Sequence, residues 1–277
     1  MKRWSATLLV VAVCSAVVHA DVTIVQKTTM EGGAVTMAQA QGAVPTPTIT
    51  NRIKGTKGRT DMDMGPSSST NISTITDAAA KQVTILDHNQ KTARVATAGQ
   101  PPPAADAPVG TLKVDASMKP TGKTQAIDGM KCDEYAFTTT LSMAEVGGPN
   151  MPPEAAAMMK DITMVMKGSL WVSKDMPGAA EYMSYQKAMA NGDLASVALG
   201  AAGLSVPGMD KLMKAMQGVE GIPVLTDIEM TIEGSGQIAD MMRQMGAMHI
   251  LTKVLSVKTD AIGDDVFKVP DGYQVIK

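Results

Sequence analysis

The chain has 277 residues, of which 44% are apolar, so it can bury a core and is not a disordered tail. Its 25 basic side chains are balanced by 27 acidic ones, for a net charge of −2. This mild acidity argues against a nucleic-acid partner, because phosphate contacts need clustered lysine and arginine.

The N-terminus has the pattern of a secretory signal peptide. Lys2 and Arg3 precede an apolar run over 8–13, and short residues lead up to Ala20, where a signal peptidase would cut. We therefore expect segment 1–20 to be removed and the mature chain to be periplasmic or secreted. The apolar run is well short of the roughly 20 residues of a membrane span, so we expect no transmembrane segment after cleavage.

The sequence predicts different roles for the two cysteines. Cys14 lies in a sequence that loosely resembles a lipobox, but Val13 stands where a small residue is usual, so lipidation is the weaker alternative. After cleavage only Cys132 remains, which rules out an intrachain disulfide. We expect Cys132 to be a buried structural thiol.

From Thr48 onward, short runs alternate apolar and polar residues between turns, as antiparallel strands do. A hairpin is predicted from segments 49–54 and 59–64, followed by a meander. Prolines in segment 99–108 indicate a surface connection. The further strands are predicted at 71–76, 82–86, 92–97, 111–115, 124–127, 131–141, 162–172, 224–233, 250–258 and 267–276.

The period changes to that of a helix in several places. Helices are predicted at 179–190, 194–203, 209–216 and 238–245, and a short one in an insertion at 147–160. The whole pattern predicts an α+β fold over 21–277. In it, a curved antiparallel sheet or half-open β-barrel is covered by a few inserted helices, with helical insertions at about 147–160 and 178–218.

Methionine is unusually frequent, with 24 residues against 2 phenylalanines and 2 tryptophans. Methionine fills irregular cores, and it also makes adaptable apolar binding surfaces. A third interpretation is thioether binding of Cu(I), suggested by the pairs Met62/Met64, Met158/Met159 and Met241/Met242. The candidate residues lining an apolar pocket are Met62, Met64, Trp171, Met213, Met216, Met230 and Met242.

Motifs for catalysis or cofactors are weak. Gly234-Ser235-Gly236 precedes a predicted helix like a dinucleotide-binding loop, but the strand before it alternates, whereas such a strand is buried on both faces. Asp61 and Asp63 share one strand face and could act as the paired carboxylates of a hydrolase, although a solvated face is the simpler interpretation. We expect no enzyme, no cofactor and no metal.

Several motifs occur in a characteristic order. They are Ile53-Lys54-Gly55-x-Lys57-x-Arg59-x-Asp61, Thr124-x-x-Ile127-x-Gly129-x-Lys131-Cys132-x-x-Tyr135, Leu170-Trp171-Val172, Gly221-Ile222-Pro223-Val224 and Phe267-x-Val269-Pro270-x-Gly272-Tyr273. This order resembles a family of exported bacterial proteins known only as a domain of unknown function. That family is similar to the periplasmic lipoprotein carrier and sorting factors, whose fold is a half-open antiparallel barrel with helices as a plug. The resemblance implies that architecture, a lipid or lipoprotein partner, and no catalytic residues.

The sequence thus predicts an exported, non-enzymatic envelope protein that binds an acyl chain or a lipoprotein segment between sheet and helices. One alternative is a structural or interaction protein with a methionine-rich packed core and no ligand. Further alternatives are a Cu(I)-binding protein and a hydrolase.

Overall fold

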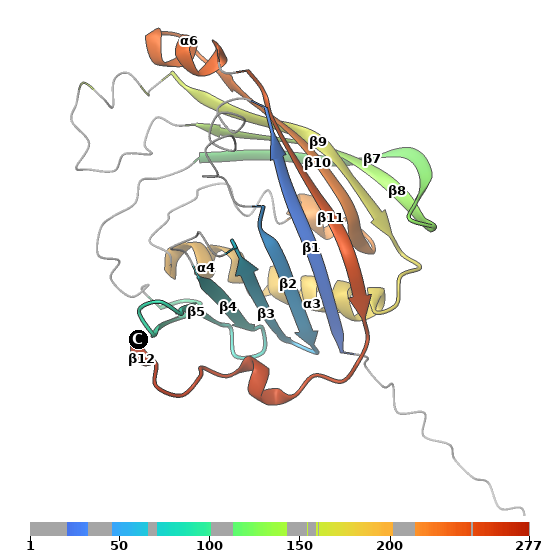
Figure 1. The fold of residues 1–277 in the computed structure, drawn as a ribbon, viewed down its shortest axis with the longest axis vertical. Helices are drawn as coiled ribbons and strands as arrows, with labels where there is room; N and C mark the ends of the chain where they lie inside the picture. The colour runs from blue at the N-terminus through green and yellow to red at the C-terminus, as the bar shows by residue number, and fades with distance from the viewer. Residues whose placement is uncertain are drawn as a thin grey trace, which may run out of the picture.

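The structure is a computed structural model of the chain (Figure 1). The residues that it describes are 21–32, 46–65, 71–100, 113–142, 154, 159, 161–201, 214–244 and 246–276. The predicted signal peptide lies outside them. So do Met213, most of the insertion at 147–160 and the proline-rich connection from residue 101 onward.

The described strands form one 12-stranded sheet in the order β12-β6-β5-β4-β3-β2-β1-β11-β10-β9-β8-β7. Neighbouring strands are antiparallel except β12 and β6, which are parallel. The sheet is open, with β12 and β7 at its edges. The strands are β1 (Val22–Glu31), β2 (Thr48–Lys54), β3 (Lys57–Asp63), β4 (Ile72–Asp77), β5 (Gln82–Asp87), β6 (Thr92–Thr97), β7 (Lys113–Ile127), β8 (Met130–Ser142), β9 (Thr163–Ser173), β10 (Ile222–Glu233), β11 (Met248–Lys258) and β12 (Gln274–Ile276).

Four short helices accompany the sheet in the described part of the chain: α3 (Ala179–Asn191), α4 (Leu194–Ala201), α6 (Gln237–Gln244) and the 3-10 helix η1 (Asp264–Phe267). Helix α3 packs on β2 and β10, α4 packs on β5 and β6, and α6 packs on β10. Helices α3 and α4 lie where the sequence period predicts them. A further helical turn at 214–217 is all that the described residues include of the helix predicted at 209–216.

The two faces of the sheet have different covers. Gly58 of β3 lies against Tyr185 of α3, whereas the adjacent Arg59 donates a hydrogen bond to the carbonyl oxygen of Val266 in η1, at 3.1 Å. Because successive strand residues point to opposite faces, α3 and η1 cover opposite sides. We call the side packed on α3 the inner face and the other side the outer face.

The predicted α+β class is wrong, because the described chain is mostly β. The sequence pattern underestimated the strands: β7 has 15 residues and β8 has 13, long for a globular protein. Strands predicted at 111–115 and 124–127 are parts of the single strand β7, whose register shifts between Pro120 and Thr124. An edge strand tolerates proline, because the side away from its neighbour has no ladder bond to lose.

The local predictions are more accurate in the N-terminal half. The predicted hairpin is present as β2 and β3, joined by the two-residue turn Gly55-Thr56 with Gly55 at a φ of 58°. The predicted meander is present as β4, β5 and β6. At the C-terminus, however, the strand predicted at 267–276 is only the three-residue β12, preceded by η1.

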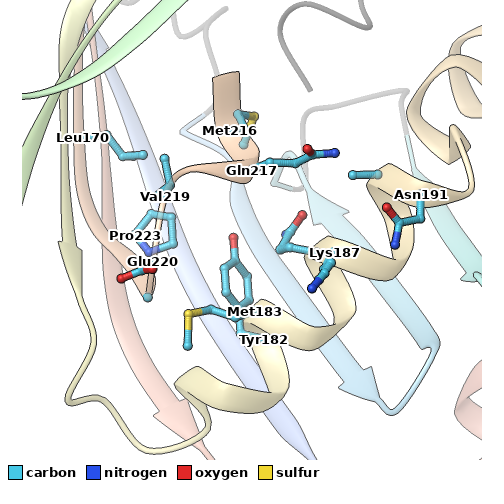
Figure 2. A pocket seen from close by; sticks show the side chains of 13 residues that line it. Leu170, Tyr182, Met183, Lys187, Asn191, Met216, Gln217, Val219, Glu220 and Pro223 are labelled. Carbon is cyan, nitrogen blue, oxygen red and sulfur yellow. The ribbon is translucent and has the colours of Figure 1, made fainter. Parts of the chain in front are cut away.

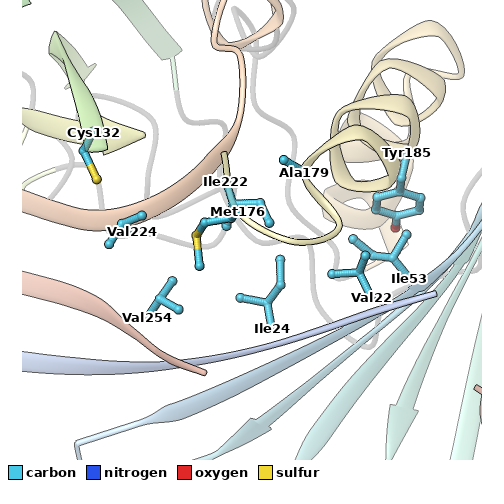
Figure 3. Packing of buried hydrophobic residues seen from close by; sticks show 10 residues of the cluster. All are labelled: Val22, Ile24, Ile53, Cys132, Met176, Ala179, Tyr185, Ile222, Val224 and Val254. Carbon is cyan, nitrogen blue, oxygen red and sulfur yellow. The ribbon is translucent and has the colours of Figure 1, made fainter. Parts of the chain in front are cut away.

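Two apolar clusters hold these layers together. On the inner face, Val22, Ile24 and Ile53 pack with Ala179 and Tyr185 of α3 (Figure 3). On the outer face, a second cluster joins the meander to the C-terminal segment; it comprises Ile75, Leu86, Ala93, Ile262 and Phe267. The inner cluster therefore attaches α3 to β1 and β2, and the outer cluster attaches the C-terminal segment to the meander.

Candidate functional site

A cavity of about 450 Å³ lies between α3, the strands β9 and β10, and the segment at 216–221 (Figure 2). Its volume is within the usual range for a small-molecule site, about 300–1,000 Å³. The residues lining it are Leu170, Tyr182, Met183, Gln186, Lys187, Ala190, Asn191, Met216, Gln217, Val219, Glu220, Gly221 and Pro223.

Helix α3 supplies one wall through two adjoining rows of side chains. Met183, Lys187 and Asn191 are spaced i, i+4, i+8, and so are Tyr182, Gln186 and Ala190, which places both rows on one side of the helix. The facing wall is apolar, with Leu170, Val219 and Pro223 (Figure 2). The cavity thus combines an apolar interior with amide and ammonium groups from α3.

Tyr182 is a half-buried polar group in this wall. Burial raises the pKa of its hydroxyl to about 12, against a smaller opposing effect of the hydrogen bond with Gln186. The hydroxyl therefore stays protonated at neutral pH and can both donate and accept a hydrogen bond.

A second compartment of about 310 Å³ adjoins the first and shares Tyr182, Gln186 and Pro223 with it. A row of polar side chains crosses its floor. Asn51 Nδ2 donates to Gln26 Oε1 at 3.2 Å, and Thr60 Oγ1 donates to Asn51 Oδ1 at 2.7 Å. The compartment can therefore hold a polar group beside the apolar cavity.

Helix α3 is held on the sheet by buried polar contacts. The hydroxyl groups of Tyr185 and Thr76 are hydrogen-bonded, and Glu181 Oε1 accepts a hydrogen bond from the backbone amide of Gly55 at 2.6 Å. A Cβ atom at Gly58 would lie 2.1 Å from the Tyr185 hydroxyl oxygen, so glycine is needed there for close packing.

The structure scatters the predicted pocket residues. Met216 lines the cavity, whereas Trp171 does not line it and packs against the inner cluster instead. Met62 is 40% exposed on β3, and Met64 is half-buried just after that strand. Met230 on β10 and Met242 on α6 are half-buried, and Met213 lies outside the described residues.

The sequence analysis missed the polar wall of α3 and the polar floor. The helix itself was predicted, and its spacing at 182, 186 and 190 was visible in the sequence. The floor could not be found in the same way, because Gln26, Asn51 and Thr60 become neighbours only through the pairing of three strands.

The carboxylates of the hydrolase hypothesis are placed differently from each other. Asp61 lies on the outer face, paired with Arg52 and with Arg59, whose Nε lies 2.8 Å from Asp61 Oδ1. Asp63 is exposed and accepts a hydrogen bond from the Gly65 amide at 2.8 Å. The two carboxylates therefore do not act on a common partner.

Asp61 begins a hydrogen-bonded chain across the outer face. Ser73 Oγ donates to Asp61 Oδ1 at 2.5 Å and lies 2.6 Å from His88 Nε2, and His88 Nδ1 lies 2.5 Å from the Tyr273 hydroxyl. A serine nucleophile must be open to substrate, but Ser73 is 2% exposed. The Ser73 hydroxyl also has only one proton, which cannot be donated to Asp61 and to His88 at the same time. This series of hydrogen bonds fixes Tyr273 of the C-terminal segment on the meander.

Replacing Asp61 by asparagine is expected to lower the free energy of unfolding at neutral pH by about 1–3 kcal/mol, because two guanidinium groups lose their charged acceptor. Burial acts to raise the pKa of Asp61, but hydrogen bonds from Ser73 and Arg59 and the arginine charges outweigh it, so the pKa lies below the ordinary 3.8. Ionised Asp61 thus stabilises the fold above pH 3.8, and the contribution disappears as the pH falls further.

Urea unfolding at neutral pH and at a series of pH values below 3.8 measures this difference. The D63N variant is the matched control, and we expect it to change stability by less than about 0.5 kcal/mol. Equal losses for D61N and D63N, or a D61N deficit that persists unchanged in acid, would contradict this assignment.

Cys132 is buried, with its Sγ atom 3.4 Å from the carbonyl oxygen of Met130, and burial raises the pKa of the thiol. This environment keeps the thiol protonated and unreactive. The described residues hold no group of three or more His, Cys, Asp or Glu side chains that could bind a metal ion. None of the helices found among these residues is long and apolar enough to cross a membrane.

No protein-family model matches the chain, and no curated protein is similar to it in sequence. The family resemblance of the sequence motifs therefore stays a prediction, and the function is argued from the geometry of the site.

Proposed function

We infer that this protein is an exported, non-enzymatic binding protein that holds an amphipathic ligand, such as a fatty acyl chain with a polar end, between α3 and the sheet. The observation that carries the proposal is the cavity of about 450 Å³ beside a compartment with a polar floor. Binding sites of this kind are mostly apolar, with a few polar groups that orient the ligand.

The two compartments suggest how such a ligand would lie. Its apolar chain would contact Leu170, Met183 and Val219 in the larger compartment, where burial contributes about 25 cal/mol per Å² of apolar surface. Its polar end would meet Asn51 or the Tyr182 hydroxyl in the smaller one.

The charges at the rim favour an anionic end over a cationic one. Glu220 lines the rim, but its carboxylate is paired with Lys174 at 2.8 Å. Lys187 is exposed at this rim of the larger compartment and does not line the smaller one, so its charge would attract an anionic ligand toward the cavity rather than hold its end.

We expect the purified mature chain to bind a fluorescent fatty acid and to release co-purified lipid when extracted with organic solvent. Replacing Ala190 by tryptophan fills the cavity from the α3 side and should weaken binding of the fluorescent fatty acid at least about tenfold, or 1.4 kcal/mol. Fluorescence titration of the parent and of A190W measures the two affinities for the fatty acid.

The control is the S184W variant, because Ser184 is exposed on the same helix and is not part of either lining. It should bind like the parent. If the parent binds no fatty acid and carries no lipid, or if A190W and S184W bind equally, the site is not a lipid-binding site, and a structural role for the methionine-rich core takes its place.

A further inference from the structure

Three methionines form a continuous row across three neighbouring strands. In the register of the sheet, Met230 of β10 lies directly opposite Met166 of β9 on one side and Met248 of β11 on the other. Directly opposed side chains have Cβ atoms about 4.5–5.5 Å apart. The long, flexible side chains of the three residues can therefore bring their sulfur atoms together.

The row lies on the inner face. On β1, the inner-face position Ile24 is followed at alternate residues by Gln26 and Thr28, and Thr28 is hydrogen-bonded to Thr252 of β11 at 2.9 Å between their hydroxyl oxygens. Met248 is four residues from Thr252 and thus shares this face. The next position along each strand supports this assignment. Those positions form a row of Lys167, Glu229 and His249, which is exposed on the outer face.

Two more thioethers flank the row at diagonal positions. Met164 is diagonal to Met230 on β9, and Met30 of β1, which faces Ile250, is diagonal to Met248. Diagonal neighbours are about 7–8 Å apart, which long side chains can reach across. All five methionines are half-buried, so they are sheltered but not sealed in.

The surroundings of the row are apolar. Its inner-face neighbours along the strands include Ile228, Ile232 and Ile250, and no acidic, histidine or cysteine side chain occupies an adjacent inner-face position in the paired strands β9–β11. Strand positions favour β-branched and aromatic residues, as these isoleucines illustrate, so three opposed methionines are not what packing alone predicts.

We propose that Met166, Met230 and Met248 form a binding site for a soft monovalent metal ion of the Cu(I) class. Thioether sulfur is a soft ligand that selects Cu(I) over hard divalent cations. An apolar setting adds to this preference, because it disfavours ions of higher charge that keep strong hydration. Met166 is four residues from the cavity-lining Leu170 on β9, which is about 13 Å at the rise per residue of a strand. The metal site therefore does not depend on the proposed lipid site.

The test is a Cu(I) titration of the full mature chain, kept anaerobic, against a chromophoric Cu(I) chelator. We expect the protein to withdraw about one equivalent of Cu(I). Leucine replaces methionine with little loss of stability, so the M166L/M230L/M248L variant should fold and lose this equivalent. The matched control, M62L/M64L/M241L, removes three thioethers elsewhere and should retain it; Met62 and Met241 are exposed, and Met64 is half-buried.

A second measurement locates the ion directly. With methionine methyl groups labelled with carbon-13, Ag(I) as a stable substitute for Cu(I) should shift the methyl signals of Met166, Met230 and Met248, while that of Met62 stays in place. The proposal is overturned if the parent withdraws no Cu(I) from the chelator, if the row variant withdraws as much as the parent, or if the shifted signals belong to other methionines.

Discussion

Replacing Phe267 by alanine is expected to lower the free energy of unfolding by about 3–5 kcal/mol, the usual cost of removing a buried aromatic ring. Phe267 is 9% exposed and packs in η1 against the outer-face cluster with Leu86 and Ile262. Its ring is the largest of the buried side chains in this cluster. Its loss leaves a cavity that the sheet cannot close by itself.

Urea unfolding of F267A measures the loss, and limited proteolysis shows whether the C-terminal segment has come away from the sheet. The control is V275A, because Val275 in β12 is 47% exposed and its truncation should change stability by less than about 0.5 kcal/mol. A loss below about 1 kcal/mol for F267A would mean that the segment contributes little to the packing of the outer face.

Replacing Tyr185 by alanine is expected to have a similarly large effect, about 3–5 kcal/mol, and also to abolish binding of the fluorescent fatty acid. Tyr185 is 9% exposed and lies between α3 and the floor of the sheet, where it belongs to the inner cluster. Without its ring, α3 loses its packing against Ile53 of β2 and Gly58 of β3, and the wall formed by Tyr182 and Lys187 moves away from the cavity.

The Y185F variant separates packing from hydrogen bonding. It keeps the ring and removes only the hydroxyl, so we expect a loss of about 1 kcal/mol and normal ligand binding. Thr76 Oγ1 remains 3.3 Å from the carbonyl oxygen of Gly58 and can still donate to it. Equal losses for Y185A and Y185F, measured by urea unfolding, would show that the hydroxyl rather than the ring holds the helix.

Local features of the fold could be predicted where a short stretch of sequence contains the whole signal. The hairpin at β2 and β3 has alternation on both arms and a glycine in its turn, and α3 has a clear helical spacing. The sequence predicts β7 as two strands because Pro120 and Gly122 interrupt the alternation. At the edge of a sheet a proline need not lose a ladder hydrogen bond, but the edge position of β7 depends on the arrangement of the whole sheet.

The C-terminal segment and the candidate site depend on distant parts of the chain. The sequence around Phe267 alternates apolar and polar residues as a strand does. However, Phe267 packs against Leu86 of the meander, and the carbonyl oxygen of Val266 accepts a hydrogen bond from Arg59. These distant contacts favour η1 instead. The cavity needs α3 to meet β10, and the methionine row needs the register of β9, β10 and β11. Composition shows that methionine is frequent but does not show which methionines meet.

The position of β1 has a consequence for folding. This first strand lies in the middle of the sheet, between β2 and β11, and pairs Thr23 with Lys258 near the other end of the chain. The half-sheet β2–β6 and the half-sheet β7–β10 are joined through β1 and β11. Closing such a long loop is slow, so the complete sheet can assemble only when almost the whole polypeptide has been made. For an exported chain, as proposed here, the delay would postpone completion of the sheet until β11 is available.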